Sequence, residues 1–198
     1  MPNMILATSP TTASDEDFKS REVDVTFQPG ETGPKVVEID LVDDLLVEAM
    51  ESFNVSIVST SNPAVSLENP AIVNILDNDE AVIGFTQDVY EITEGSGKAR
   101  VEVGLLSGKT AVPVTVSFTT NAGTAGEDDF DAKTMDITFE PGETEKWVEI
   151  DITDDNLLEP TESFGVSLVS SSVEAVKLGN PSSVNILDND GKYVLIIE

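Results

Sequence analysis

Two short acidic segments of this chain could bind a metal ion through carboxylate oxygens. Val73–Asp79 reads VNILDND, and the same seven residues recur at Val184–Asp190. Each segment ends in two carboxylates separated by an amide, and hard cations such as Ca²⁺ prefer clustered oxygen ligands of this kind. The copies are 111 residues apart, which is a common domain length. The spacing therefore predicts a modular protein with an acidic cluster at the end of each module.

The elements that carry these clusters are predicted to be β-strands. Val37–Ser59 and Val148–Ser170 are identical at 15 of 23 positions, so the repeat extends well upstream of the acidic segment. Within it, Phe164, Val166 and Leu168 alternate with mostly polar residues, which is typical of strands with one face on a core. Pro-Gly pairs at 29–30 and 141–142 suit tight turns between strands. Short strands with frequent turn signals predict an all-β sandwich.

The repeat divides the chain into three parts. Residues 80–190 form a complete domain, with seven strands expected at 82–92 (broken near Gln87), 98–106, 112–120, 134–140, 146–153, 162–170 and 181–187. Residues 1–79 form a truncated copy that lacks the first two strands, and residues 191–198 resemble the start of a third copy. We expect the truncated copy to expose apolar surface that the two missing strands would cover.

Strand parity places the acidic loops of the complete domain at one end. In a sandwich of seven alternating strands, the loops after strands one, three and five share an end with the exit of strand seven. The acidic residues in these segments are Glu94, Glu127, Asp128, Asp129, Asp154, Asp155, Glu159, Glu162, Asp188 and Asp190. Like charges held together repel one another unless a cation neutralises them. The alternative is an ordinary solvated acidic surface, as in proteins adapted to high salt.

Composition excludes several classes of function. The net charge is −28, with 10 Lys and Arg against 38 Asp and Glu, so nucleic acid and anionic membranes would repel the chain. Without Cys or His it offers no zinc site of the usual type, no thiol nucleophile and no His-based triad. No apolar run approaches the roughly 20 residues that span a bilayer, and the N-terminus lacks signal-peptide features. We expect a protein that is not an enzyme, with any targeting segment outside this chain.

Several linked motifs resemble the Calx-β domain family. They are Asp-Phe, Phe-x-Pro-Gly-Glu-Thr, Ile-x-Asp-Asp-x-x-x-Glu-x-x-Glu-x-Phe-x-Val and Val-x-Ile-x-Asp-x-Asp, and together they cover nearly the whole chain. The resemblance implies an immunoglobulin-like antiparallel β-sandwich that binds Ca²⁺. It also implies the calcium ligands of the complete copy: Glu94, Asp129, Asp154, Asp155, Glu159, Glu162, Asp188 and Asp190. The counterparts in the first copy are Asp17, Asp43, Asp44, Glu48, Glu51, Asp77 and Asp79.

Two departures from the family pattern predict fewer ions or weaker binding. Asn189 and Asn156 stand where the family has Asp, and each exchange removes one negative charge. The first copy has no counterpart of Glu94, so its site is expected to be the weaker one. Asp77–Glu80 is both the end of the first domain and the linker to the second. Calcium is therefore expected to stiffen the joint.

The family resemblance leaves three functions open. The first is a tandem calcium-binding segment of an extracellular adhesion, matrix or cell-surface protein, whose partners are neighbouring domains of the array or other surface proteins. The second is an intracellular calcium-sensing domain of a cation exchanger. The third is a passive acidic scaffold without a specific site.

Overall fold

A computed structural model describes residues 3–191 of the chain. The chain forms two compact units. The first comprises Met1–Asp44 and Ala49–Asn78, and the second comprises Leu45–Glu48 and Asp79–Glu198. The short segment Leu45–Glu48 thus groups with the second unit, although it belongs to the first copy of the repeat. The expected start of a third copy, at 191–198, lies outside the described residues apart from Gly191.

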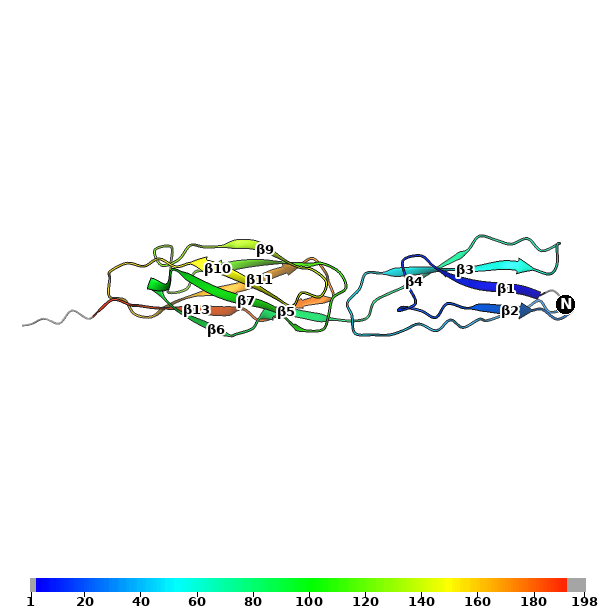
Figure 1. The fold of residues 1–198 in the computed structure, drawn as a ribbon, viewed down its shortest axis with the longest axis horizontal. Helices are drawn as coiled ribbons and strands as arrows, with labels where there is room; N and C mark the ends of the chain where they lie inside the picture. The colour runs from blue at the N-terminus through cyan, green and yellow to red at the C-terminus, as the bar shows by residue number, and fades with distance from the viewer. Residues whose placement is uncertain (1–2, 192–198) are drawn as a thin grey trace, which may run out of the picture. The chain divides into compact units, whose positions relative to one another are not determined.

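The second unit is a sandwich of two β-sheets, labelled in Figure 1. One sheet has the strand order β10-β7-β5-β12, and the other has the order β6-β13-β11-β8-β9. This arrangement confirms the predicted immunoglobulin-like β-sandwich. The strands are β5 Ala81–Phe85, β6 Val89–Thr93, β7 Lys98–Ser107, β8 Val114–Asn121, β9 Thr134–Phe139, β10 Glu145–Asp151, β11 Glu162–Ser171, β12 Val176–Leu178 and β13 Ser182–Leu187.

Alternation along the strands builds the core between these sheets. In β10, Val148 and Ile150 are buried while Glu149 between them is exposed. Trp147 is out of phase with these residues and is 47% exposed. The guanidinium of Arg100 covers its ring at 4.9 Å from the centroid, a cation–π contact. Residues facing inward from both sheets form one continuous apolar cluster.

The opening strand is divided between the two sheets. The break near Gln87 separates β5 from β6, which join different sheets. The hydroxyl of the buried Ser182 donates to the Gln87 carbonyl at 2.8 Å and holds the crossover. β5 pairs in parallel with β12, and β6 pairs in parallel with β13. The other strand pairs described in the sandwich are antiparallel. β12 was not predicted from the sequence.

The first unit contains one four-stranded sheet of order β2-β1-β3-β4. Its strands are β1 Asn3–Pro10, β2 Glu22–Thr26, β3 Glu51–Thr60 and β4 Ala71–Ile75. Val37–Asp40 has the sequence pattern of β10 but forms no strand. The ladder of β10 in the second unit runs entirely along β7, and the first copy contains no counterpart of β7.

The first unit buries much less apolar surface than the second. Its buried cluster consists of Ala13, Phe18 and Phe53, with four partly buried side chains packed around it. Leu41 is 56% exposed, whereas Ile152, its counterpart in the complete copy, is 6% exposed. This confirms the prediction that the truncated copy exposes apolar surface. No helix within the described residues is long and apolar enough to cross a membrane.

Candidate metal centre

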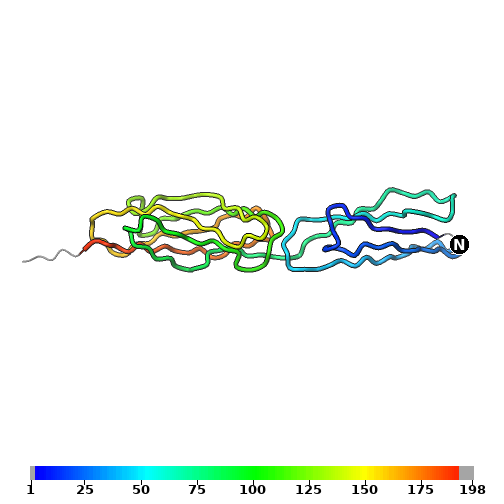
Figure 2. The backbone as a smooth tube through the Cα atoms, in the orientation of Figure 1, coloured from blue at the N-terminus to red at the C-terminus, as the bar shows by residue number. Residues whose placement is uncertain are grey.

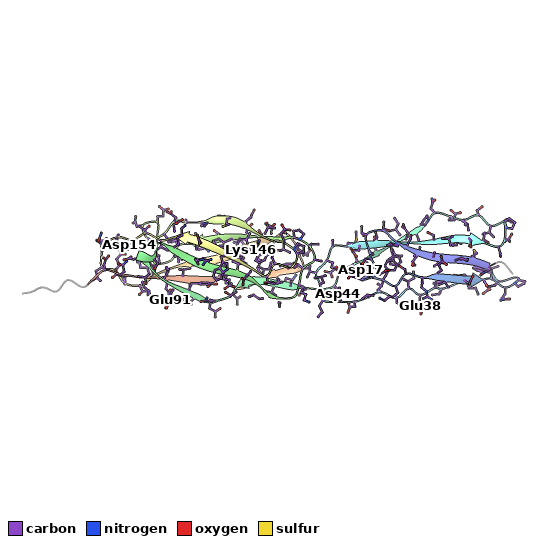
Figure 3. All side chains as sticks on the ribbon, viewed as in Figure 1. Asp17, Glu38, Asp44, Glu91, Lys146 and Asp154 are labelled. Carbon is purple, nitrogen blue, oxygen red and sulfur yellow. The ribbon has the colours of Figure 1, made fainter. Side chains whose placement is uncertain are left out.

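The acidic loops of the second unit meet at the end where the chain leaves β13. Figure 2 shows the loop between β10 and β11 beside the segment that follows β13, and the backbone N–H of Glu159 in that loop donates to Asp188 Oδ2 at 3.3 Å. Figure 3 labels Asp154 at this end, whereas Lys146 and Glu91 lie farther along the sheets. The backbone therefore brings the acidic loops to one end of the sandwich, as strand parity predicts.

One group of carboxylates combines the turn after β6 with the exit of β13. Glu94, Asp188 and Asp190 each place an oxygen within 4.8 Å of the others. Glu94 begins a short 3-10 turn, Glu94–Ser96, and is only 4% exposed. Burial raises the pKa of Glu94, and repulsion by the neighbouring Asp side chains adds to the increase. The group thus holds a buried carboxyl that is costly to ionise without a cation.

Asp190 carries a second sign that this group is incomplete by itself. Among the described residues, its Oδ2 is a buried side-chain oxygen without a hydrogen-bond partner. Burial raises the pKa of Asp190, and repulsion by Asp188, the largest charge effect, acts in the same direction. Buried polar atoms normally have partners, so an unpartnered acceptor beside a buried Glu fits a site for a cation.

A second group combines the loop between β8 and β9 with the start of β11. Oxygens of Asp129, Glu159 and Glu162 lie within 4.8 Å of one another. Burial raises the pKa of Glu162, and the charge of Asp129 is the next largest cause. Burial also raises the pKa of Glu159, with repulsion by Asp155 as the next cause. This group therefore resembles the first in chemistry, because it too brings three carboxylates close together.

A stacked pair of phenylalanines positions the second group. Phe130 and Phe164 are buried, with ring centroids 4.0 Å apart and planes within 12° of parallel. Phe130 follows Asp129 directly, and Phe164 comes two residues after Glu162 on the same face of β11. The Oδ2 of Asp129 also accepts the N–H of Gly126 at 2.7 Å, which fixes the carboxylate within its own turn. Core packing therefore brings these two acids together.

Asp154 and Asp155, also predicted as ligands, lie outside both groups. Asp154 Oδ1 accepts the side-chain N–H of Asn189 at 2.7 Å, and Asp155 Oδ1 accepts the N–H of Leu157 at 2.6 Å. Both Asp residues are exposed, as are Glu127 and Asp128 in the loop after β8. The amide of Asn189 thus occupies an oxygen of Asp154 that a cation could otherwise take.

The first copy repeats several of these local arrangements. Asp17 Oδ2 accepts the N–H of Ser14 at 2.6 Å, as Asp129 does from Gly126, and Phe18 stacks on Phe53 at 4.2 Å. Asn78 donates to Asp43 Oδ1 at 3.3 Å, the counterpart of the contact between Asn189 and Asp154. Burial acts to raise the pKa of Asp17, but hydrogen bonds with Ser14 and Glu51 outweigh it and the pKa is lowered.

The remaining predicted ligands of the first copy are divided between the units. Asp44, Glu51 and Asp77 belong to the first unit, whereas Glu48 and Asp79 group with the second.

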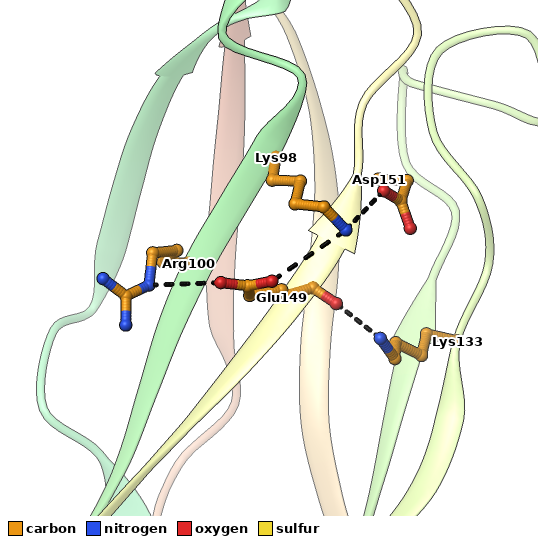
Figure 4. A network of polar contacts seen from close by, with 5 residues as sticks. All are labelled: Lys98, Arg100, Lys133, Glu149 and Asp151. Carbon is orange, nitrogen blue, oxygen red and sulfur yellow. Dashed lines mark hydrogen bonds and ion pairs between the residues drawn. The ribbon is translucent and has the colours of Figure 1, made fainter.

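A further charged cluster lies on the outer face of β7 and β10, shown in Figure 4. Lys98 contacts Asp151 at 2.7 Å and Glu149 at 3.9 Å, and Arg100 contacts Glu149 at 3.7 Å. Hydrogen bonding to Lys98 lowers the pKa of Asp151. These acids are half exposed and already paired with cations. They form a surface ion-pair network, which contributes little to stability because solvent screens the charges.

Organising residues that are not acidic were the main omission of the sequence reasoning. The sequence indicates only that Asn189 removes one negative charge. In the structure its backbone N–H donates to Glu94 Oε1 at 3.3 Å, and its side chain donates to Asp154. Gly95 makes room for it, because a Cβ there would lie 2.5 Å from Asn189 Nδ2. The shared Asp-Asn-Asp sequence of both copies was the available signal for this role.

Comparison with known proteins identifies the two repeats. A family model described as the Calx-beta domain matches residues 4–79 and 76–191. The sodium/calcium exchanger Calx of Drosophila melanogaster is 30% identical over 161 residues, covering 80% of this chain. The human FRAS1-related extracellular matrix protein 2 is 32% identical over 157 residues, covering 73% of this chain. The chain spans 17% of the exchanger and 5% of the matrix protein.

Solved structures agree with this assignment. The apo form of the Calx CBD1 domain has a TM-score of 0.53 at 30% identity, and the match covers 57% of this chain and all of that domain. The Calx CBD2 domain, with a TM-score of 0.50 at 23% identity over 55% of this chain, shares the fold.

Proposed function

This chain belongs to the Calx-beta domain family, and from that membership we propose that its second unit binds calcium at the end where its acidic loops meet. The observation that carries the proposal is the buried Glu94 beside the unpartnered oxygen of Asp190. Both belong to a group of three carboxylates with oxygens within 4.8 Å of one another. Oxygens around one Ca²⁺, each at about 2.3–2.6 Å from it, lie at comparable mutual distances.

The arrangement favours calcium over other ions. All candidate ligands are carboxylate oxygens, which suit hard cations, and the chain lacks the Cys and His that zinc and copper prefer. The ligands come from flexible Asp and Glu side chains on separate loops, which tolerate the irregular shell of Ca²⁺ better than the strict octahedron of Mg²⁺. Glu94, Asp188 and Asp190 would hold one ion, and Asp129, Glu159 and Glu162 would hold another.

The consequence of binding would be mechanical. Each group joins segments that are distant in sequence: the turn after β6 with the exit of β13, and the loop after β8 with the start of β11. A bound cation would replace repulsion between these segments with shared ligation. The end of the sandwich would then change from mutually repelling loops to a cross-linked cap. The sequence-based expectation that the linker Asp77–Glu80 also stiffens stays a prediction.

A tandem calcium-stiffened segment of an extracellular matrix or adhesion protein is the biological role we favour. Its support is the repeat itself and the similarity to a FRAS1-related extracellular matrix protein. The similarity to a sodium/calcium exchanger supports a second role, a calcium-responsive regulatory pair. Affinity separates the two: by analogy with EF-hand proteins, extracellular modules bind calcium at roughly 10⁻⁴–10⁻³ M and sensors at roughly 10⁻⁷–10⁻⁵ M.

Isothermal titration calorimetry with calcium tests the site. We expect saturable binding by the whole chain, and its loss or marked weakening in Glu94→Gln. Glu91→Gln is the matched control, because Glu91 is an exposed acid of β6 three residues away and the substitution removes the same charge. Equal heats from the two variants and the wild type would show that the acidic end is a passive charged surface without a specific site.

A further inference from the structure

The segment Leu45–Glu48 contributes a core residue to the second unit. Val47 is fully buried and belongs to the apolar cluster of that unit. Its N–H donates to the Lys109 carbonyl at 2.9 Å, and its carbonyl accepts the N–H of Ala111 at 2.9 Å. Val47 thereby forms a parallel β-bridge with Thr110, itself 6% exposed. Both backbone polar groups of Val47 are satisfied by one turn of the second unit.

Leu46 lies beside the same turn of the second unit. It lines a cavity of about 500 Å³ with Leu105 and with two turns, Lys109–Ala111 and Pro141–Thr144. We call Leu46–Val47 the anchor pair and these lining residues of the second unit the acceptor surface. The turn before Lys109 depends on Gly108, whose φ is +76° and whose Cβ would lie 2.6 Å from the Glu80 carbonyl oxygen. The acceptor surface is thus a fixed feature of the fold.

The second copy carries its own anchor pair. Leu157–Leu158 occupies the repeat positions of Leu46–Val47, with the same Asp-Asp before it and the same Glu after it. These leucines are 62% and 52% exposed. Single exposed leucines need no explanation. Here, however, two adjacent ones stand where the other copy has a fully buried valine.

We propose that Leu157–Leu158 is a docking element for a further Calx-beta domain, which receives it on its own counterpart of Lys109–Ala111. The repeat supplies the occupant, because the equivalent pair already rests on that surface in this chain. Charge does not oppose this contact: the pair lies between Asp155 and Glu159, and the acceptor surface includes Lys109 as well as Glu143, whose carboxylate is already paired with Lys146. The acidic flanks oppose insertion into an anionic membrane.

The junction that such a domain requires is already present in the sequence. Asp188–Asp190 repeats Asp77–Asp79, the segment that leads into the second unit. A three-copy array made of residues 1–190 followed by residues 80–191 therefore reproduces the natural junction between copies residue for residue. Successive domains would each insert an anchor pair into the next, so the array would be held by one contact repeated along its length.

Thiol accessibility tests this directly, because the chain contains no cysteine. In the chain of 198 residues, Leu158→Cys should react rapidly with a chromogenic thiol reagent, and Val47→Cys should react slowly. In the three-copy array, we expect Leu158→Cys in the middle copy to react at least about tenfold more slowly than in the last copy, since labelling then requires local opening. Val169→Cys, at an exposed position of β11, is the control and should react equally in both proteins.

Three results would overturn the proposal. Equal labelling of Leu158→Cys in the middle and last copies, in calcium and in chelator, would show that no domain covers the pair. Slower labelling in the 198-residue chain as its concentration rises would assign the pair to self-association. Protection that persists after the acceptor turn of the added copy is disrupted by Thr110→Asp, with that copy still folded by circular dichroism, would place the contact elsewhere. Leu158 adjoins Glu159, a ligand of the proposed calcium site, so labelling is compared in calcium and in chelator. Protection of the middle copy that persists in chelator would support docking even if the proposed calcium site failed, so the two failures are distinguishable.

Discussion

Replacing Glu94 by Gln removes one charge from the most buried carboxylate of the proposed site and keeps its shape. In chelator, we expect the variant to be at least as stable as the wild type, because the cost of burying a charge and the repulsion by neighbouring Asp residues, which together raise the pKa of Glu94, both disappear. The new amide can still accept the N–H of Asn189 and can donate to Asp188 or Asp190 beside it. In calcium, the order of stability should reverse, because one ligand has lost its charge.

The size of the reversal follows from binding linkage. Calcium at about 100 times its dissociation constant stabilises the wild type by roughly 2.7 kcal/mol. If loss of the Glu94 charge weakens binding by about 10- to 100-fold, as substitutions near metal sites do, the stabilisation falls to roughly 1.4–0.4 kcal/mol. The deficit of about 1.3–2.3 kcal/mol corresponds to a melting temperature lower by about 5–9 °C for a domain of this size.

Differential scanning calorimetry of the whole chain, with calcium and with chelator, provides the measurement. The transition of the second unit should rise with calcium in the wild type and in Glu91→Gln, and much less in Glu94→Gln. A calcium shift of equal size in all three proteins would refute the reasoning, because it would show that calcium acts through general charge screening. A strong loss of stability of Glu94→Gln in chelator would refute the claim that the ionised Glu94 is unfavourable without an ion.

Three further predictions follow from the same geometry. The raised pKa values of Glu94, Glu159, Glu162 and Asp190 mean that the folded unit holds protons more tightly than the unfolded chain. Its melting temperature in chelator should therefore rise as pH falls from neutral toward 4.5, and the increase caused by calcium should become smaller over that range. A melting temperature that does not change with pH would contradict this. Asn189→Asp should lower the melting temperature in chelator and tighten calcium binding in calorimetry, because it replaces the hydrogen bond to Asp154 with repulsion; unchanged affinity would show that the amide does not limit the site. Phe130→Ala should lower the free energy of unfolding, measured with a chemical denaturant, by about 3–5 kcal/mol and should also weaken calcium binding. Phe118 is also buried but lies away from the loops, so Phe118→Ala should cause a similar loss of stability with less effect on calcium binding.

The sequence was most informative where inward-facing and outward-facing residues alternate along a strand. The buried Val148 and Ile150 and the outward Trp147 follow directly from period-2 patterning, which depends only on local geometry. Val37–Asp40 shows the limit of this reasoning. It has the same pattern as β10 yet forms no strand, since a strand also needs a partner along its edge. β12 was missed because its three residues are too few to show a period.

The division of the carboxylates into two groups could not be predicted from the sequence. Strand parity places all the acidic loops at one end, but oxygen distances depend on where each loop turns. Asp154 and Asp155 point their oxygens at N–H groups of Asn189 and Leu157, while Glu159 and Glu162 approach Asp129. Likewise, the pattern around Val47 gave no sign that this residue packs into the core of the second unit, because its partners lie some sixty residues farther along the chain.

Calcium titration followed by amide NMR shifts tests the central claim most directly. The backbone N–H groups of Asn189, Glu159 and Gly126 each donate to a carboxylate of the proposed site, so they report on both groups at once. The account predicts that these three signals move together and saturate, while the amide of Trp147 on the outer face of β10 stays in place. Shifts spread evenly over the acidic surface, without saturation, would contradict it.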